Sequence, residues 1–176
     1  MTEQVSDAIR RRIRDVPDFP KPGILFKDIT PVFADPQTFN QCLDATAAQY
    51  AGRPIDAIVG IESRGFIFGG ALAARMHKAF VPARKPGKLP AAKQRINYQL
   101  EYGSDALEMH SDAIKPGEKV LIVDDLLATG GTAWAACELV RSLGGEVIGA
   151  SFVIELTFLP GRSRLKPVEV FTLVQY

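Results

Sequence analysis

The sequence predicts an α/β fold in which a mostly parallel central sheet is flanked by helices. Short apolar runs typical of buried strands alternate with segments of helical periodicity, an order that favours parallel sheets. Two of these runs lead into glycine-containing loops that open helices, at residues 62–65 and 126–132. Because ligands of such folds bind beyond the carboxyl ends of the strands, we expect the functional residues in these loops.

Composition indicates one compact domain spanning residues 1–176, since 47% of the 176 residues are hydrophobic and 23% are charged. The formal net charge of +1 provides no global basic field, which argues against nucleic-acid binding. Cys42 and Cys137 lack the spacing of a metal or disulfide framework. The charged N-terminus contains no apolar signal core, and no apolar stretch is long enough for a bilayer. We therefore expect a cytoplasmic protein without membrane association.

The first 50 residues predict two helices separated by a loop. Val5, Ile9, Ile13 and Val16 recur at helical spacing, and Pro17 ends this run. Prolines and glycine interrupt any helix between residues 17 and 31, although residues 24–26 are apolar. An apolar loop of this kind is expected to cover something. The second helix is predicted over residues 38–50.

The rest of the chain alternates between the two element types. Strands are predicted at residues 56–61, 79–84, 119–125, 146–156 and 168–174, and helices at residues 65–77 and 133–143. A basic turn at residues 85–90 leads into residues 96–102. The turn signal of Gly103 and Ser104 then predicts a hairpin whose return strand holds Leu107 and Met109.

The clearest motif follows the strand at residues 119–125. Two acids, Asp124 and Asp125, precede a glycine-rich turn that opens a helix. Backbone amides and the positive helix end would bind a phosphate monoester there, and the glycines allow close approach. No lysine follows the glycines, so this is not a Walker loop. Because consecutive residues of a strand point to opposite faces, we expect the strand to end at the acids, where a sugar diol could meet both.

This combination of apolar strand, paired acids and the Ala-Thr-Gly-Gly-Thr run of residues 128–132 resembles the phosphoribosyl pyrophosphate (PRPP) signature of the type I phosphoribosyltransferases. The resemblance extends over essentially the whole chain and is to adenine-specific members, through residues 19–31, 60–66, 82–90, 100–103 and 153–156. It implies a type I phosphoribosyltransferase fold with a small hood (about residues 17–34), a flexible β-hairpin lid (about 86–110) and a PRPP loop (120–132). The implied reaction is transfer of phosphoribose from PRPP to a purine, with release of pyrophosphate.

The resemblance also implies a role for each matching residue. Asp124 and Asp125 would hold the ribose hydroxyls. The 5′-phosphate would be bound by Ala128, Thr129, Gly130, Gly131 and Thr132. Pyrophosphate would be bound by Ser63, Arg64, Gly65, Arg84, Lys85 and Lys88, unless the last three form only a solvated turn and Arg64 only caps its helix. One or two Mg²⁺ ions are implied, held mainly through PRPP oxygens and water, and so is a homodimer.

Two further assignments concern the base and the chemistry. Glu101 is the candidate carboxylate that stabilises the ribosyl cation and manages the purine proton, with Arg64 as a second catalytic residue and Tyr102 closing the lid. The alternative is an exposed hairpin acid beside a packing tyrosine.

In the hood, Phe26 would stack on the purine, while the backbone of Leu25 and Lys27 offers a carbonyl to the exocyclic amine and an amide to a ring nitrogen. Adenine fits this polarity, whereas a 6-oxopurine would leave buried groups unpaired. Phe26 could instead be a core residue. Many family members have arginine where Lys27 stands, which matters little if only its backbone meets the base.

Two other functions remain as alternatives. One is a phosphoribosyltransferase for hypoxanthine, guanine or xanthine. The other is a non-catalytic regulator that senses PRPP, which would need a nucleic-acid-binding or partner domain beyond the one expected here. The hood and Glu101 favour the adenine-specific enzyme of purine salvage, forming AMP.

Overall fold

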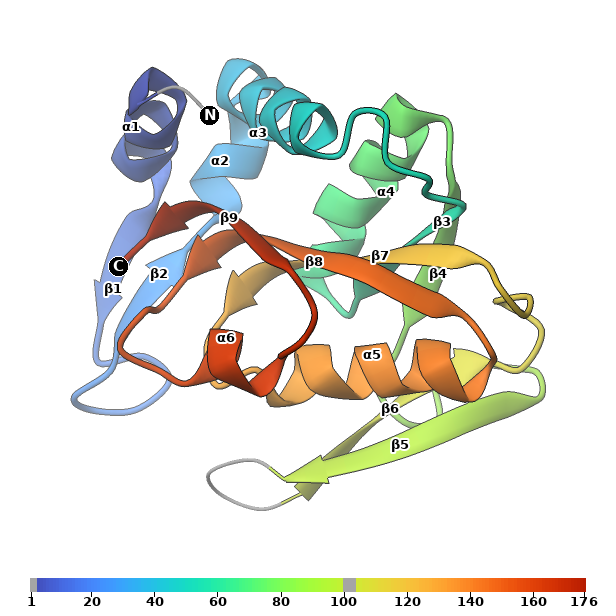
Figure 1. Cartoon of the computed structure of the whole chain (residues 1–176). Helices are drawn as coiled ribbons and strands as arrows, with labels where there is room; N and C mark the ends of the chain where they lie inside the picture. The colour runs from blue at the N-terminus through green and yellow to red at the C-terminus, as the bar shows by residue number, and fades with distance from the viewer. Residues whose placement is uncertain (1–2, 100–103) are drawn as a thin grey trace.

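A five-stranded parallel sheet forms the centre of the computed structural model, which describes residues 3–99 and 104–176 (Figure 1). Its strand order is β4-β3-β7-β8-β9, and every neighbouring pair is parallel. The strands are β3 (Ala57–Ile61), β4 (Ala79–Ala83), β7 (Lys119–Leu127), β8 (Glu146–Glu155) and β9 (Val170–Gln175). The predicted mostly parallel sheet is confirmed.

Helices cover both faces of this sheet. One face carries α1 (Glu3–Arg12), α2 (Thr30–Ala34), α3 (Pro36–Gln49) and α4 (Arg64–Met76), and the other carries α5 (Gly131–Ser142) and the short α6 (Gly161–Arg164) (Figure 1). Alternate residues of β7 divide the core accordingly. Leu121 and Val123 pack with residues of α3 and α4, whereas Val120 and Ile122 pack with residues of α5. No helix within the described residues combines the length and apolarity needed to cross a bilayer.

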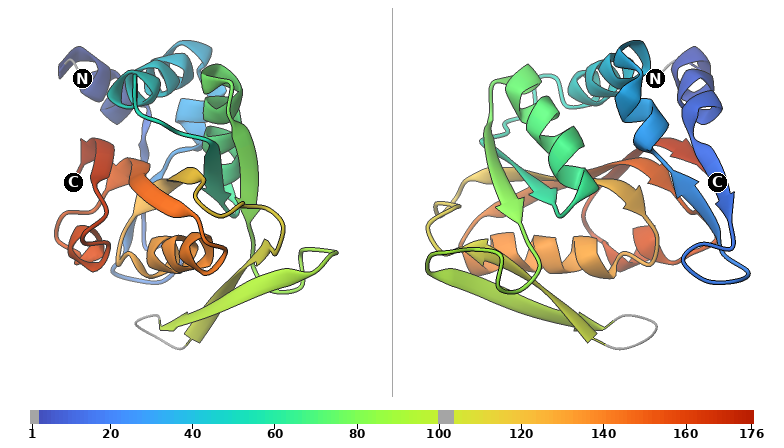
Figure 2. Two further views of the ribbon diagram at one scale, coloured as in Figure 1. Left: turned by 45° about the vertical axis from the view of Figure 1, so that its right-hand side comes forward. Right: turned by 180° about the vertical axis from the view of Figure 1, so that it is seen from behind.

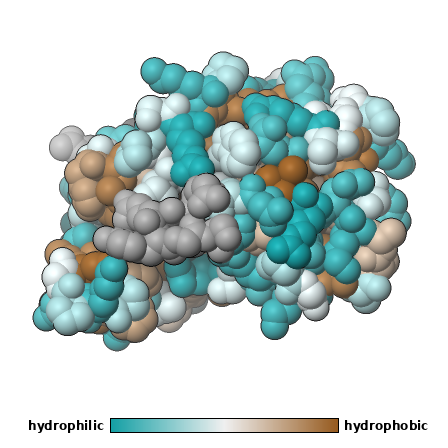
Figure 3. All heavy atoms as spheres, turned by 90° about the horizontal axis from the view of Figure 1, so that it is seen from below, coloured by the Kyte–Doolittle hydropathy of each residue, from teal (hydrophilic) through white to brown (hydrophobic). Residues whose placement is uncertain are grey.

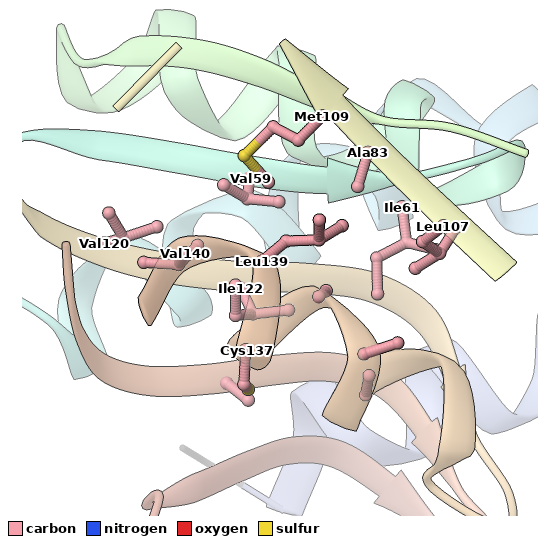
Figure 4. Close-up of a cluster of buried hydrophobic side chains, with 14 of the residues drawn as sticks. Val59, Ile61, Ala83, Leu107, Met109, Val120, Ile122, Cys137, Leu139 and Val140 are labelled. Atoms are coloured by element: carbon pink, nitrogen blue, oxygen red, sulfur yellow. The ribbon is translucent and has the colours of Figure 1, made fainter. Parts of the chain in front are cut away.

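The predicted hairpin is present as β5 (Lys93–Gln99) and β6 (Ser104–His110), an antiparallel pair that packs beside α5. Met109 of β6 points toward Val59 of β3, and Leu107 of β6 lies beside Ile61 of the same strand (Figure 4). These contacts join the base of the hairpin to the core. The side of the molecule on which the hairpin lies is mostly hydrophilic, with apolar atoms in separate small patches (Figure 3).

The N-terminal region differs from the prediction in two ways. The first helix ends at Arg12, and Val16 belongs to β1 (Arg14–Pro17), which pairs antiparallel with β2 (Leu25–Asp28) (Figure 2). The expected loop at residues 17–31 is therefore largely a hairpin. Apolar spacing alone could not reveal this, because Val16 satisfies both the helical repeat and its actual pairing with Phe26. Pro17 is tolerated because it ends its strand.

The expectation that the central strand ends at the paired acids is wrong. β7 runs to Leu127, and Leu126 and Leu127 pair with Ile154 and Glu155 of β8. The neighbouring strand is long enough to continue the ladder past the acids. Two short helices, α2 and α6, were also not predicted, since four or five residues give too little periodicity to detect.

Candidate active site

The loop between β7 and α5 forms a small pocket at the carboxyl edge of the sheet. The pocket has a volume of about 90 Å³ and is lined by Asp124 and residues 126–133. Gly130 is the N-cap of α5 and has a φ of 78°, a left-handed conformation that favours glycine. The amides of the first helical turn have no partner within the helix, so this end of α5 suits a phosphate. Residues 128–132 are called the phosphate loop below.

The two acids of β7 have different surroundings. Asp124 is half-buried, lines the pocket and accepts a hydrogen bond from the backbone N–H of Asp125 at 2.8 Å. Asp125 is nearly buried and forms an ion pair with Nε of Arg64. Burial, and next the charge of Asp125, raise the pKa of Asp124 well above its ordinary value. A carboxyl in this position ionises only at a cost.

Arg64 connects the sheet to the hood. It is the first residue of α4, where its guanidinium reaches Asp125 and also lies 5.7 Å from the centre of the Phe26 ring. Burial by itself lowers the pKa of Arg64, but the charge and hydrogen bond of Asp125, together with the charges of Asp124 and Asp28, raise it above its ordinary value. The simple helix cap considered as an alternative does not describe this side chain, which has an acid on one side and an aromatic ring on the other.

The start of α4 approaches β7 closely. A Cβ atom on Gly65 would lie 2.6 Å from Oδ1 of Asp124 and 3.1 Å from the carbonyl oxygen of Val123. Any side chain there would push the helix away from the strand. Ser63 is the N-cap of the helix, and its peptide bond with Glu62 is cis. The loop predicted to bind pyrophosphate therefore stands directly beside the acids.

Phe26 belongs to the hood and not to the core. Its ring is half-buried, meets Phe19 edge-on at 5.1 Å, and lies outside both core clusters. The side chain of Lys27 is held by Asp15 at 2.7 Å and lies 4.2 Å from the centre of the Tyr176 ring. The side chain of Lys27 is therefore engaged within the protein, and the prediction for this residue requires only its backbone. Leu25 is half-exposed.

The second basic group makes contacts within the protein. Arg84 Nε lies 3.1 Å from Oε2 of Glu62, and Arg84 also donates a hydrogen bond to the carbonyl of Lys88 at 3.1 Å. Lys85 forms an ion pair with Asp105. Lys88 is exposed. Arg84 and Lys85 are thus partly buried and have partners within the protein, which residues of a solvated turn would not have. The side chain of Lys88 is as exposed as expected in a solvated turn.

Three comparisons with known proteins bear on this arrangement. The family model described as "Phosphoribosyl transferase domain" matches residues 39–174. An adenine phosphoribosyltransferase of Sorangium cellulosum is 58% identical over 173 residues, which cover 96% of this chain and 86% of the relative. The chain belongs to the adenine phosphoribosyltransferase family.

Solved structures of the family agree. The crystal structure of adenine phosphoribosyltransferase from Thermoanaerobacter pseudethanolicus superposes with a TM-score of 0.95 at 51% identity, covering 97% of this chain and 99% of that one. The enzyme from Saccharomyces cerevisiae, complexed with an imino-altritol bisphosphate and adenine, gives a TM-score of 0.93 at 44% identity and covers 98% and 100% of the two chains. The type I phosphoribosyltransferase fold is confirmed.

Within this family fold, one contact of the site was missed by the sequence reasoning. The hydroxyl of Tyr98 accepts a hydrogen bond from Oγ1 of Thr132 at 3.1 Å and one from Nζ of Lys85 at 2.9 Å. Tyr98 thereby joins the β5–β6 hairpin to both predicted phosphate-binding groups. Asp105, its cross-strand partner, could not be found from the sequence, because the predicted turn at Gly103 and Ser104 would place Met109 opposite Tyr98. Glu62, the partner of Arg84, gave no signal either. Glu101 and Tyr102 lie outside the described residues.

Proposed function

We propose that this chain transfers the 5-phosphoribosyl group of PRPP to adenine, giving AMP and pyrophosphate in purine salvage. The observation that carries the proposal is the Arg64 side chain, which joins an aromatic hood to the acids beside a phosphate loop. This arrangement offers adjacent places for a base, a ribose and a phosphate. Neither alternative function is favoured by a specific feature of the structure.

Each end of PRPP has a matching part of the site. The 5′-phosphate binds the amides and hydroxyls of residues 128–132, and the ribose hydroxyls bind Asp124 and Asp125. Pyrophosphate binds at residues 63–65 and at Arg84, Lys85 and Lys88. Arg84 and Lys85 exchange part of their present contacts for the pyrophosphate oxygens, which carry more charge than the carboxylates they replace.

The reaction breaks the bond from C1′ to the pyrophosphate oxygen and forms a bond from C1′ to an imidazole nitrogen of adenine. The electron pair of the broken bond leaves with pyrophosphate, where Arg64 and its neighbours stabilise the added negative charge. The ribose becomes cationic as that bond breaks. Glu101 stabilises this cation and accepts the proton that adenine loses. The lid, including Tyr102, excludes the water that would otherwise hydrolyse the sugar.

Magnesium enters with PRPP in this proposal. Mg²⁺ commonly binds one or two carboxylates together with substrate phosphates and water, and Asp124 and Asp125 are carboxylates of this kind. The described residues contain no group of three or more metal-ligating side chains, so an all-protein cage is not part of the proposal. Bound with PRPP, the ion would neutralise charge on the departing pyrophosphate.

A panel of purines tests the proposed function. With PRPP and Mg²⁺, adenine is expected to give AMP with a kcat/KM at least about 100-fold above those of hypoxanthine and guanine, because a 6-oxo group leaves buried polar groups unpaired at a cost of roughly 3 kcal/mol. Product formation is measured by chromatography with and without Mg²⁺. Comparable turnover of hypoxanthine would contradict the adenine assignment and favour the 6-oxopurine alternative.

The variant Phe26→Ala separates the base site from the PRPP site. Because the ring lies outside the core, its loss should weaken adenine binding by about 1 to 3 kcal/mol, the scale of base stacking on an aromatic ring, while KM for PRPP stays nearly unchanged. Steady-state kinetics with each substrate varied in turn measures both. Equal losses for the two substrates would show that Phe26 stabilises the whole site and not the base.

The variant Asp124→Asn should gain stability and lose PRPP affinity. The raised pKa means that stability present at acidic pH is lost as pH rises through that pKa, and asparagine removes this loss. We expect a gain of about 1 kcal/mol at pH 8 and less at pH 5, measured by urea unfolding. KM for PRPP should rise about 10-fold, since a charged acceptor of the ribose is removed. A variant with unchanged KM for PRPP would exclude Asp124 from the ribose site.

A homodimer and a cytoplasmic location complete the proposal. Ile67 of α4 is 50% exposed and Phe80 of the edge strand β4 is 36% exposed, which gives this side of the sheet apolar surface that a second copy could cover. Sedimentation equilibrium tests this proposal and should give twice the mass of the chain. Cys42 and Cys137 are free and buried, which suits a reducing compartment.

A further inference from the structure

We infer that α6 positions the phosphate loop, with Gly161 as the contact and the ion pair between Arg162 and Glu155 as the anchor. The three are positioning residues, since they act on PRPP through the loop. The inference rests on the proposed function for the identity of the ligand. It concerns only the end of the ligand that carries a phosphate monoester.

The first argument is the closeness of the two backbones. A Cβ atom on Gly161 would lie 2.2 Å from the carbonyl oxygen of Ala128 and 2.9 Å from Cγ of Leu127. From the other side, a Cβ atom on Gly130 would lie 2.7 Å from the carbonyl oxygen of Gly161. Gly161 lies at the start of a helix and its φ is not positive, so any residue could adopt its backbone conformation. Glycine is required there by lack of space.

The second argument is the anchor beneath this contact. Arg162 donates two hydrogen bonds to Glu155, from Nε to Oε1 at 2.8 Å and from Nη2 to Oε2 at 2.6 Å. It also donates to the carbonyl of Val170 at 2.8 Å. Glu155 is 4% exposed and accepts further bonds from Thr172 and Gln175. These hydrogen bonds, that from Arg162 first, lower the pKa of Glu155, so the carboxylate stays charged and the anchor intact at neutral pH.

The anchor and the phosphate loop are attached to the same pair of neighbouring strands, β7 and β8. Glu155 is the last residue of β8 and pairs with Leu127, the residue before the phosphate loop. The backbone N–H of Leu156 also donates to the carbonyl of Leu127 at 3.0 Å. The helix α6, which lies beside the start of α5 in Figure 1, is thus fixed to the carboxyl ends of β8 and β9. From there it limits how far Ala128 and Gly130 can move.

The consequence is selective. A displaced loop would misdirect its amides from the 5′-phosphate, and a shift of about 1 Å can cost on the order of 100-fold in function. Among the described helices and strands, α6 packs mainly against α5, and not against the elements of the proposed base site in the hood or of the proposed pyrophosphate site at α4 and β4. Displacing α6 should therefore weaken binding of the phosphoribosyl end of the ligand and leave binding of the base and of pyrophosphate unchanged.

The variant Gly161→Ala tests this directly, with Gly145→Ala as its matched control. A Cβ atom on Gly145, between α5 and β8, would also be crowded, at 2.7 Å from Ile114 and 2.8 Å from Val140, two core residues away from the loop. Gly161→Ala should raise KM for PRPP about 10-fold or more and leave KM for adenine within about twofold. Gly145→Ala should lower the melting temperature while leaving both KM values near those of the parent protein.

Binding of ribose 5-phosphate, measured by calorimetry, provides a readout that does not need turnover. Gly161→Ala should weaken it in the same proportion as PRPP. If the parent protein forms no AMP, the proposed function fails, yet this comparison still decides the inference. Unchanged binding in Gly161→Ala, or equal weakening in Gly145→Ala, would overturn it.

Should Gly161→Ala not fold, Arg162→Lys replaces it. Lysine keeps the charge but cannot form the two-pronged contact with Glu155. Ribose 5-phosphate binding should weaken relative to Arg141→Lys, a control in the exposed ion pair with Glu138 on α5. Equal binding by these two variants would likewise overturn the inference.

Discussion

Replacement of Glu101 by glutamine is expected to slow the single-turnover formation of AMP by about 100-fold or more, the scale of a positioned acid-base or electrostatic group. The amide keeps the size of the side chain but can neither offset the ribosyl cation nor accept the purine proton. Affinity for both substrates should barely change, because the carboxylate acts when charge develops in the transition state.

The measurement uses enzyme in excess over PRPP, since slow product release would hide a defect of the chemical step in steady-state turnover. Glu108→Gln is not a suitable control, because Glu108 is buried and accepts a hydrogen bond from the backbone N–H of Gly87. Glu146→Gln, at the exposed first residue of β8 and outside the predicted site, is the matched control. A single-turnover rate for Glu101→Gln within about threefold of that control would remove Glu101 from catalysis.

Replacement of Arg64 by glutamine is expected to lower kcat/KM by about 100-fold or more, the scale seen when a charge-stabilising donor is removed from an active site. The loss has two sources. Pyrophosphate loses a cation as it departs, and Asp125 is left nearly buried without its ion-pair partner. The second source should also lower stability, because an unpaired buried carboxylate is costly.

Two controls separate these sources. Arg75→Gln removes an arginine from the last turn of the same helix, where it contacts Asp44 and Asn40 at the surface, and should leave kcat/KM unchanged. The double variant with Arg64→Gln and Asp125→Asn removes the unpaired charge and should recover stability without recovering kcat. If the double variant regained full activity, Arg64 would serve only to neutralise Asp125.

Much of the fold followed from local sequence patterns. Apolar runs at residues 56–61 and 146–156 give strands almost to the residue, because a fully buried parallel strand needs apolar side chains on both faces. The hairpin at β5 and β6 followed from its turn signal, although Ser104, placed in the turn by the prediction, is the first residue of β6 and pairs with Gln99. The hood was missed as a hairpin, since pairing between Val16 and Phe26 depends on residues ten apart and leaves no periodic signal in either segment.

The sequence by itself determined the family, the parallel sheet and the position of the phosphate loop, because these depend on contiguous motifs whose glycines, acids and apolar residues have local physical requirements. Only the tertiary structure decided how the site is connected. Each of its deciding contacts joins residues 33 to 61 positions apart in the chain. They are the contacts of Arg64 with Asp125 and Phe26, of Tyr98 with Thr132, and of Gly161 with Ala128. Such contacts arise from the packing of whole elements, which no single segment encodes.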